Sequence, residues 1–170
     1  MQVLFDRNQI AQTVARLADE INDYYSPYND PEPVLVVGIL NGAFPFLADL
    51  MRHFNFPVEI DLMRIGSYGT SHVSSGVVQI KTEPDASPQD RRVLIVEDII
   101  DTGRSMAFLY DYFKQKHAQE IRSVVLLDKF ERREIDIHCD HIGFEIANLF
   151  VAGYGLDGGG MHRQLPDIQA

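Results

Sequence analysis

The chain has 170 residues, of which 45% are hydrophobic and 24% are charged, and we expect residues 1–170 to form a single domain. Its 25 acidic residues exceed its 15 lysines and arginines, and the formal net charge of −10 argues against broad binding to nucleic acid or anionic membranes. Cys139 is the single cysteine, which excludes an intrachain disulfide and suits a reducing compartment.

Helix and strand patterns alternate from the start of the chain. From Asn8 to Tyr24, apolar residues recur at every third or fourth position, as in an amphipathic helix. Val34–Ile39 is an apolar run that predicts a strand buried on both faces. A turn at Asn41–Gly42 then leads into a helix within residues 40–54, with Pro45 near its first turn.

The remaining pattern predicts further strands and one more helix. Strands are expected at Val58–Ile65 and Gly76–Ile80, and the polar residues between them form either a plain loop or a lid over a site. Four elements follow: a short buried strand at Val93–Val96, a helix at Met106–Lys116, a strand at Val124–Leu127 and a final strand near Leu149–Ala152. This alternation predicts an α/β fold with a mostly parallel sheet flanked by helices, which binds ligands at the carboxyl ends of its strands.

The sequence shows no targeting or membrane-spanning pattern. Its first residues, MQVLFDRNQIAQ, lack the basic start and apolar core of a secretory signal. No apolar run approaches the roughly 20 residues of a membrane span. We therefore expect a cytoplasmic location.

The stretch VLIVEDIIDTGRS, residues 93–105, has the character of a phosphate site. Gly103 permits a tight turn before the helix, and Thr102 and Ser105 supply hydroxyl groups. With the free amide groups of the helix start, they would form a small phosphate cradle. Because unpaired charge is costly to bury, we expect Glu97 and Asp98 to lie where the strand emerges from the core.

The three carboxylates of Glu97, Asp98 and Asp101 require a partner other than phosphate. A sugar diol can donate hydrogen bonds to carboxylates, and a divalent metal would screen their charge. The combination indicates a pentose phosphate ligand. The alternative is a strand-to-helix turn with a solvated acidic face.

This stretch resembles the ribose-phosphate signature of the type I phosphoribosyltransferases, and EDIIDTG (97–103) resembles the hypoxanthine-guanine branch of that purine-salvage family. The resemblance extends to four more blocks: VVGILNGAFPFLADL (36–50), IGSYGTSHVSSG (65–76), VVLLDKFERR (124–133) and IGFEIANLFVAGYGLD (142–157). It implies the type I phosphoribosyltransferase fold, with a small hood formed by the terminal segments. It also implies transfer of a 6-oxopurine, hypoxanthine and also guanine, to phosphoribosyl diphosphate with magnesium (Mg2+) as cofactor.

The resemblance assigns the ribose-phosphate and purine residues. Asp101 would face N7 of the purine as general acid/base, because a proton must be managed as the base attacks the sugar. The ribose-phosphate would be bound by Glu97, Asp98, Asp101, Thr102, Gly103, Arg104 and Ser105, of which the two acids face the ribose hydroxyls. The purine would be bound by Lys129 through O6, by Phe150 through stacking, by the backbone of Val151, and by Asp157.

The resemblance also assigns the groups around the pyrophosphate. These are Leu40, Asn41 and Gly42, where the family tends to have a cis peptide, together with Arg133 and Arg163. Glu97, Asp98 and Asp157 would hold the metal, and Ser67 and Tyr68 would belong to a lid that excludes water.

Two departures from the family pattern leave alternatives open. The family usually has Lys or Arg at the position of Asn41, and a bulkier stretch where this chain has Gly158–Gly160. Apart from these departures, one alternative is an enzyme of the same fold that prefers xanthine or guanine, which the residues around Lys129 and Phe150–Leu156 would decide. Another is a catalytically weak paralogue that binds phosphoribosyl diphosphate in a regulatory role. A regulatory protein that binds RNA or a transcription factor is disfavoured by the net charge of −10 and by Asp101.

The resemblance further implies a homodimer or homotetramer. The helix after Asn41 has more apolar residues than one core contact needs, namely Phe44, Phe46, Leu47 and Leu50. Two other motifs are rejected. Residues 153–158 match G-x-G-x-x-G, but too few residues follow for a dinucleotide-binding unit. Residues 138–141 (HCDH) lack the second half of a zinc site.

Overall fold

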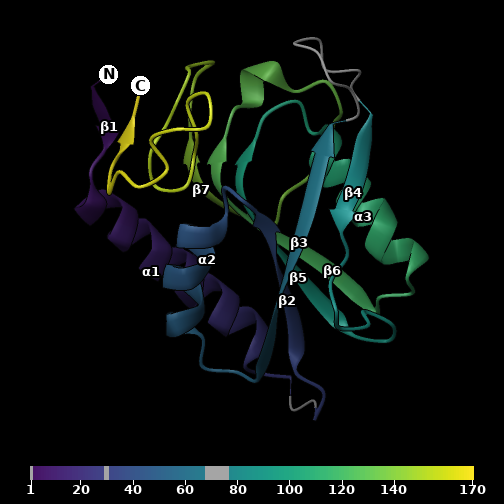
Figure 1. Cartoon of the computed structure of the whole chain (residues 1–170). Coiled ribbons are helices and arrows are strands. Elements are labelled where there is room, and N and C mark those ends of the chain that lie inside the picture. The colour runs from purple at the N-terminus through teal and green to yellow at the C-terminus, as the bar shows by residue number, and fades with distance from the viewer. Residues whose placement is uncertain (1, 29–30, 68–76) are drawn as a thin grey trace.

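A six-stranded sheet forms the centre of the computed structural model, which describes residues 2–28, 31–67 and 77–170 (Figure 1). The strand order is β4-β3-β2-β5-β6-β7, and neighbouring strands are parallel except β3 and β4. The strands are β2 (Val34–Leu40), β3 (Val58–Ser67), β4 (Val78–Thr82), β5 (Arg92–Ile100), β6 (Glu120–Asp128) and β7 (His141–Glu145). The predicted α/β fold with a mostly parallel sheet is confirmed.

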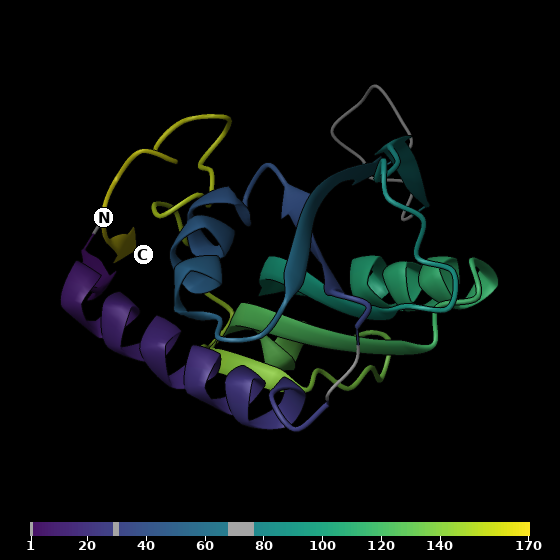
Figure 2. The ribbon, with the colours of Figure 1, turned by 90° about the horizontal axis from the view of Figure 1, so that it is seen from below.

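Helices cover both faces of this sheet, as Figures 1 and 2 show. The helices are α1 (Arg7–Tyr25), α2 (Phe44–Leu50) and α3 (Arg104–Gln115), with two short 3-10 turns, η1 (Met51–His53) and η2 (Phe130–Arg132). None of the described helices has the length and apolarity that crossing a bilayer requires.

The core has two layers because β2 and β5 are apolar on both faces. Val36 and Leu94 pack with α1 and α2, whereas Val37 and Ile95 pack with α3. Gly38 lets α2 approach β2 closely, since a Cβ atom there would lie 2.5 Å from the Cδ2 atom of Leu47. Continuous apolar strands of this kind are expected when helices cover a parallel sheet on both sides.

The start of α1 has a capping box. The Asp6 carboxylate accepts hydrogen bonds from the backbone amides of Asn8 and Gln9 at 2.8 and 2.9 Å. The Gln9 side chain in turn accepts from the Asp6 amide at 2.9 Å. Both reciprocal bonds satisfy donors that the first turn of a helix leaves free.

The two ends of the chain lie together beside the main sheet. β1 (Val3–Phe5) pairs in antiparallel fashion with β8 (Ile168–Gln169), and the amide of Gln2 donates to the carbonyl of Ala170 at 2.8 Å. We call residues 2–6 and 146–170 the hood. The predicted hood of terminal segments is thus present.

Two predicted strands differ from the structure. The strand predicted at Val93–Val96 continues to Ile100, so Glu97 and Asp98 lie inside it. The strand predicted near Leu149–Ala152 is wrong, because the last strand of the main sheet is β7 and Leu149 is 41% exposed. β7 alternates polar and apolar residues, and it is recognisable only by its pairing with β6.

Candidate active site

A cavity of about 320 Å³ lies at the carboxyl ends of β2, β3 and β5. The hood contributes one wall through Asp157 and Arg163. Ten residues predicted from the sequence line this cavity: Leu40, Gly42, Glu97, Asp98, Asp101, Thr102, Gly103, Ser105, Asp157 and Arg163. Residues from four separate parts of the chain therefore meet at one place.

The predicted phosphate cradle is built as a strand-to-helix turn. Gly103 has a φ of 87° and precedes α3, and a Cβ atom on it would lie 2.7 Å from the carbonyl oxygen of Ile135. Gly103 has no side chain to cap the helix, and the Arg104 amide donates to Oγ1 of Thr102 at 3.4 Å. Arg104 does not line the cavity and forms an ion pair with Glu134.

Glu97 and Asp98 are enclosed, which corrects the expectation that they lie where the strand emerges. Glu97 is only 8% exposed and accepts a hydrogen bond from the amide of Asp98 at 3.1 Å. Burial, together with the neighbouring Asp98, raises the pKa of Glu97 well above its ordinary value, and burial also raises the pKa of Asp98. Burial therefore disfavours the charged forms of these two carboxyl groups, and a bound ligand or cation would compensate their negative charge.

The loop after β2 fits tightly against these acids. The Leu40–Asn41 peptide is cis. A Cβ atom on Gly42 would lie 1.6 Å from Oδ2 of Asp98, so a larger residue would displace that carboxylate. On its other side, the Gly42 carbonyl oxygen lies 2.1 Å from where Gly155 would carry a Cβ atom. Two glycines therefore allow the acid, the loop and the hood to touch.

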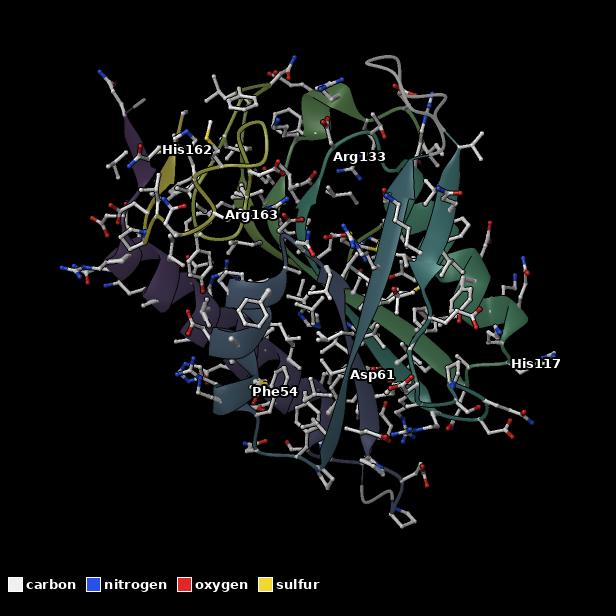
Figure 3. The ribbon with its side chains drawn as sticks, viewed as in Figure 1. Phe54, Asp61, His117, Arg133, His162 and Arg163 are labelled. Atoms are coloured by element: carbon white, nitrogen blue, oxygen red, sulfur yellow. The ribbon has the colours of Figure 1, made fainter. Side chains whose placement is uncertain are left out.

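Arg163 is the cation of the cavity wall. Its guanidinium donates to the Gly155 carbonyl at 2.6 Å and pairs with Asp157 at 2.9 Å (Figure 3). The other Asp157 oxygen accepts from the Gly160 amide at 2.8 Å, and Gly159 and Gly160 have φ values of 65° and 86°. The triglycine thus forms the turn that brings Asp157 and Arg163 together.

Of the predicted purine residues, Asp157 lines the cavity, whereas Lys129, Phe150 and Val151 are not among its lining residues. Lys129 is only 8% exposed, and its ammonium group makes no hydrogen bond or ion pair within the part of the chain that the structure describes. Val151 is buried, whereas Phe150 is 66% exposed and so is not a core residue. One edge of the Phe150 ring lies 3.4 Å from the Cβ position of Gly158, and the ring is otherwise open to a ligand.

Among the described residues, Asp101, unlike Glu97 and Asp98, has an arginine partner. Its Oδ2 atom accepts a hydrogen bond from Nη1 of Arg132 at 3.1 Å. Its Oδ1 atom is buried and has no partner among the described residues. Sequence reasoning missed Arg132, whose one signal was its place beside Arg133 in the FERR block.

Some predicted residues lie elsewhere. The Arg133 guanidinium pairs with the Asp128 carboxylate and donates to the Ile137 carbonyl at 3.1 Å, so the structure does not bring it into the cavity (Figure 3). Asn41 is exposed beside the cavity. Tyr68 lies outside the described residues, and Ser67 is described only as the last residue of β3.

The acids of the cavity suit a hard cation. Carboxylate oxygens are the ligands that Mg2+ prefers, and Mg2+ is usually held by one or two of them together with water and substrate phosphates. No three acids among the described residues converge into a complete protein-only metal centre. The buried Glu97 and the partly buried Asp98 therefore fit a cation that arrives with a phosphorylated ligand.

The chain is similar to known proteins along nearly its whole length. The family model described as phosphoribosyl transferase domain matches residues 3–158. Hypoxanthine-guanine phosphoribosyltransferase of Aquifex aeolicus is 41% identical over 99% of this chain and 93% of its own length. The Bacillus subtilis protein of the same name is 43% identical over 98% and 91%. The structure of Trypanosoma cruzi hypoxanthine phosphoribosyltransferase in complex with the product IMP superimposes with a TM-score of 0.91 at 35% identity, covering 99% and 92% of the two chains.

Burial of Glu97 predicts a pH-dependent cost in stability. Because the pKa of Glu97 is raised in the folded protein, this group contributes to the stability of the fold below its unfolded-state pKa. The contribution is lost as the pH rises through its folded-state pKa. The free energy of unfolding of Glu97→Gln and of the wild type is measured in urea, in a buffer without divalent cations. The stability of the variant relative to the wild type should be greater at pH 8 than at pH 5. The same substitution at exposed Glu145 is the control. An identical gain at both pH values would contradict this account.

Proposed function

The chain belongs to the phosphoribosyl transferase family, and from this membership we propose that it is the purine salvage enzyme that joins a 6-oxopurine to phosphoribosyl diphosphate. The products are a nucleoside 5′-monophosphate and pyrophosphate, and hypoxanthine and guanine are the bases. The observation that carries the proposal is the meeting of Asp101, the buried acids and the helix start of α3 in one cavity. We treat residues 1–170 as a single catalytic domain.

Phosphoribosyl diphosphate would lie along the cavity floor. The 5′-phosphate would accept hydrogen bonds from the turn at residues 101–105, where α3 begins without a side-chain cap at Gly103. Glu97 and Asp98 would accept hydrogen bonds from the ribose hydroxyls, which would offset the cost of removing these carboxylates from water. The pyrophosphate would lie between the loop at 40–42 and Arg163, which contact each other through Gly155.

Mg2+ would be held by Glu97, Asp98 and Asp157 together with the substrate. Its chemistry there is to neutralise the charge that develops on the departing pyrophosphate. All three acids line the cavity.

Asp101 would manage the proton of the reaction. As N9 of the purine forms its bond to the sugar carbon, the bond from that carbon to the pyrophosphate oxygen breaks, and the pyrophosphate leaves with the electron pair. The positive charge gained by the base is removed when the carboxylate of Asp101 takes the proton from N7. The Oδ1 atom of Asp101, buried and unpartnered among the described residues, is suited to accept it.

Base selection would depend on Lys129 and Phe150. The Lys129 side chain is largely buried and its ammonium group has no partner among the described residues, so a purine O6 atom would supply an acceptor. Adenine presents an amino group at this position and would leave Lys129 unsatisfied. The exposed ring of Phe150 offers a stacking surface, with the Val151 backbone beside the ring edge.

The remaining expectations are part of the same proposal. Ser67 and Tyr68 would belong to a lid that excludes water from the reaction. The enzyme would act in the cytoplasm and would need neither nucleic acid nor membrane as a partner. No observation favours the alternative of a catalytically weak, regulatory paralogue.

An apolar groove suggests how the chain forms a homo-oligomer. The groove lies between α2 and β3, and its apolar members are Phe44 (59% exposed), Met51 (38%), Ile60 (38%) and Leu62 (37%). Apolar surface gathered in this way is typical of an interface between subunits. We therefore propose that a second copy of the chain covers it in a dimer or tetramer.

The central test of the proposal is nucleotide formation from phosphoribosyl diphosphate, Mg2+ and a purine base. We expect product from hypoxanthine and guanine but not from adenine. Asp101→Asn should lower kcat by about 10²- to 10⁴-fold, the usual contribution of a general acid/base, with little change in KM. Absence of product from every 6-oxopurine would refute the proposed function. Wild-type turnover in Asp101→Asn would refute only the role of Asp101.

Asn41 should limit the affinity for phosphoribosyl diphosphate, because no cation stands at this exposed position of the loop. Asn41→Lys is expected to lower KM for phosphoribosyl diphosphate about fivefold, the equivalent of one exposed ion pair, with kcat unchanged. High salt should weaken the effect. Asn8→Lys makes the same charge change on the exposed side of α1 and serves as the control. If both variants lowered KM equally, the cause would be the change in net charge and not the position of Asn41 in the loop.

Leu62→Glu should disrupt the proposed oligomer by placing a charge in the apolar groove. Sedimentation equilibrium should show a smaller assembly for this variant than for the wild type. Val3→Glu changes another exposed apolar residue, on β1, and should leave the assembly unchanged. A wild-type mass for Leu62→Glu would exclude this groove as the interface.

A further inference from the structure

Residues 129–135 form a strap across the loop that carries Asp101. At one end of the strap, the Lys129 amide donates to the Ile100 carbonyl at 2.9 Å. At the other end, the amides of Glu134 and Ile135 donate to the Thr102 carbonyl at 2.9 and 3.1 Å. The backbone on both sides of Asp101 is thus held by the same segment.

The middle of the strap is the short helix η2, which directs Arg132 toward Asp101. The Arg132 amide donates to the Lys129 carbonyl at 3.2 Å, and the Arg133 amide donates to the Phe130 carbonyl at 3.2 Å. These bonds set the direction of the Arg132 side chain, whose Nη1 atom lies 3.1 Å from Oδ2 of Asp101.

The two oxygens of Asp101 are consequently not equivalent. Oδ2 has the Arg132 guanidinium as its donor, whereas Oδ1 is buried with no donor among the described residues. A buried acceptor without a donor is unfavourable, and a ligand that brings an N–H group would satisfy it. Without Arg132, the plane of the carboxylate would be free to turn about the Cβ–Cγ bond, since this torsion is broad.

We propose that Arg132 is a positioning residue, which holds Oδ2 of Asp101 so that Oδ1 points to the purine N7. This inference rests on the proposed function and adds to it the residue that orients the general base. Displacing a reacting group slightly lowers the rate without weakening substrate binding, so the effect falls on kcat.

A purely structural role for the ion pair is not supported by its exposure. The Arg132 and Asp101 side chains are 47% and 35% exposed, and exposed ion pairs contribute little to stability. The strap itself is held by backbone bonds that do not involve the Arg132 side chain. Removing the guanidinium should therefore leave the fold intact.

The strap also contacts the loop that leads to Phe150. The Glu131 carboxylate accepts a hydrogen bond from the Asn148 amide at 3.1 Å. The turn of η2 is therefore linked both to the general base and to the segment that stacks on the purine. Arg132 makes the first of these contacts and its neighbour Glu131 makes the second, so the same turn can align the Asp101 carboxylate with the purine.

The test compares Arg132→Gln and Arg132→Lys with the wild type in the hypoxanthine reaction. Arg132→Gln should lower kcat about tenfold, while KM for both substrates changes less than about twofold. Arg132→Lys keeps a donor and should recover part of the loss. Arg52→Gln breaks another exposed Arg–Asp pair, with Asp49, and should leave kcat unchanged. Urea unfolding of each variant checks the fold.

A double-mutant cycle with Asp101→Asn separates positioning from other roles. If Arg132 acts through Asp101, adding Arg132→Gln to Asp101→Asn should cause no further loss in kcat. The proposal is overturned if the loss is as large as in the wild-type background, if Arg132→Gln keeps wild-type kcat, or if the change falls on KM. Should Arg132→Gln fail to fold, the cycle is carried out with Arg132→Lys. Lack of activity in the wild type would instead refute the proposed function.

Discussion

The enclosure of Glu97 and Asp98 within β5 is the constraint around which the site is organised. Carboxyl groups inside a sheet are costly, and burial raises the pKa of both. The structure accepts this cost at the carboxyl edge of the sheet, where a polyhydroxyl ligand and a cation can compensate it. A fold optimised only for stability would place apolar residues there, as it does at Val93–Val96 of the same strand.

Close packing around these acids connects distant parts of the chain. Gly42 leaves room for the Asp98 carboxylate, and Gly155 leaves room for the Gly42 carbonyl. The hood therefore touches the pyrophosphate loop directly, and Arg163 donates to the carbonyl of the same Gly155. On the opposite side, the strap at residues 129–135 holds the loop of Asp101. These close contacts shape the cavity, while Asp101 and Asp157 are each paired with an arginine, Arg132 and Arg163.

The two departures from the family pattern have different consequences. The triglycine makes a turn with positive φ values that brings Asp157 and Arg163 together, so it is compatible with the assigned roles. Asn41 leaves the pyrophosphate loop without a cation, and Arg133, engaged with Asp128, does not replace it in the cavity. Under the proposed function, electrostatic compensation for the pyrophosphate would fall mainly to Arg163 and Mg2+.

The sequence by itself determined the α/β fold, the turn at Gly103 and the residues of the ribose-phosphate stretch, because these depend on local periodicity and on conformations that few residues adopt. It failed for β7 and for the end of β5, where pairing with β6 overrides local pattern. Only the tertiary structure decided that Glu97 is buried, that Arg133 faces Asp128, and that Arg132 faces Asp101. The direction of a long charged side chain depends on neighbours that are distant in sequence, and spacing along the chain carries no record of them.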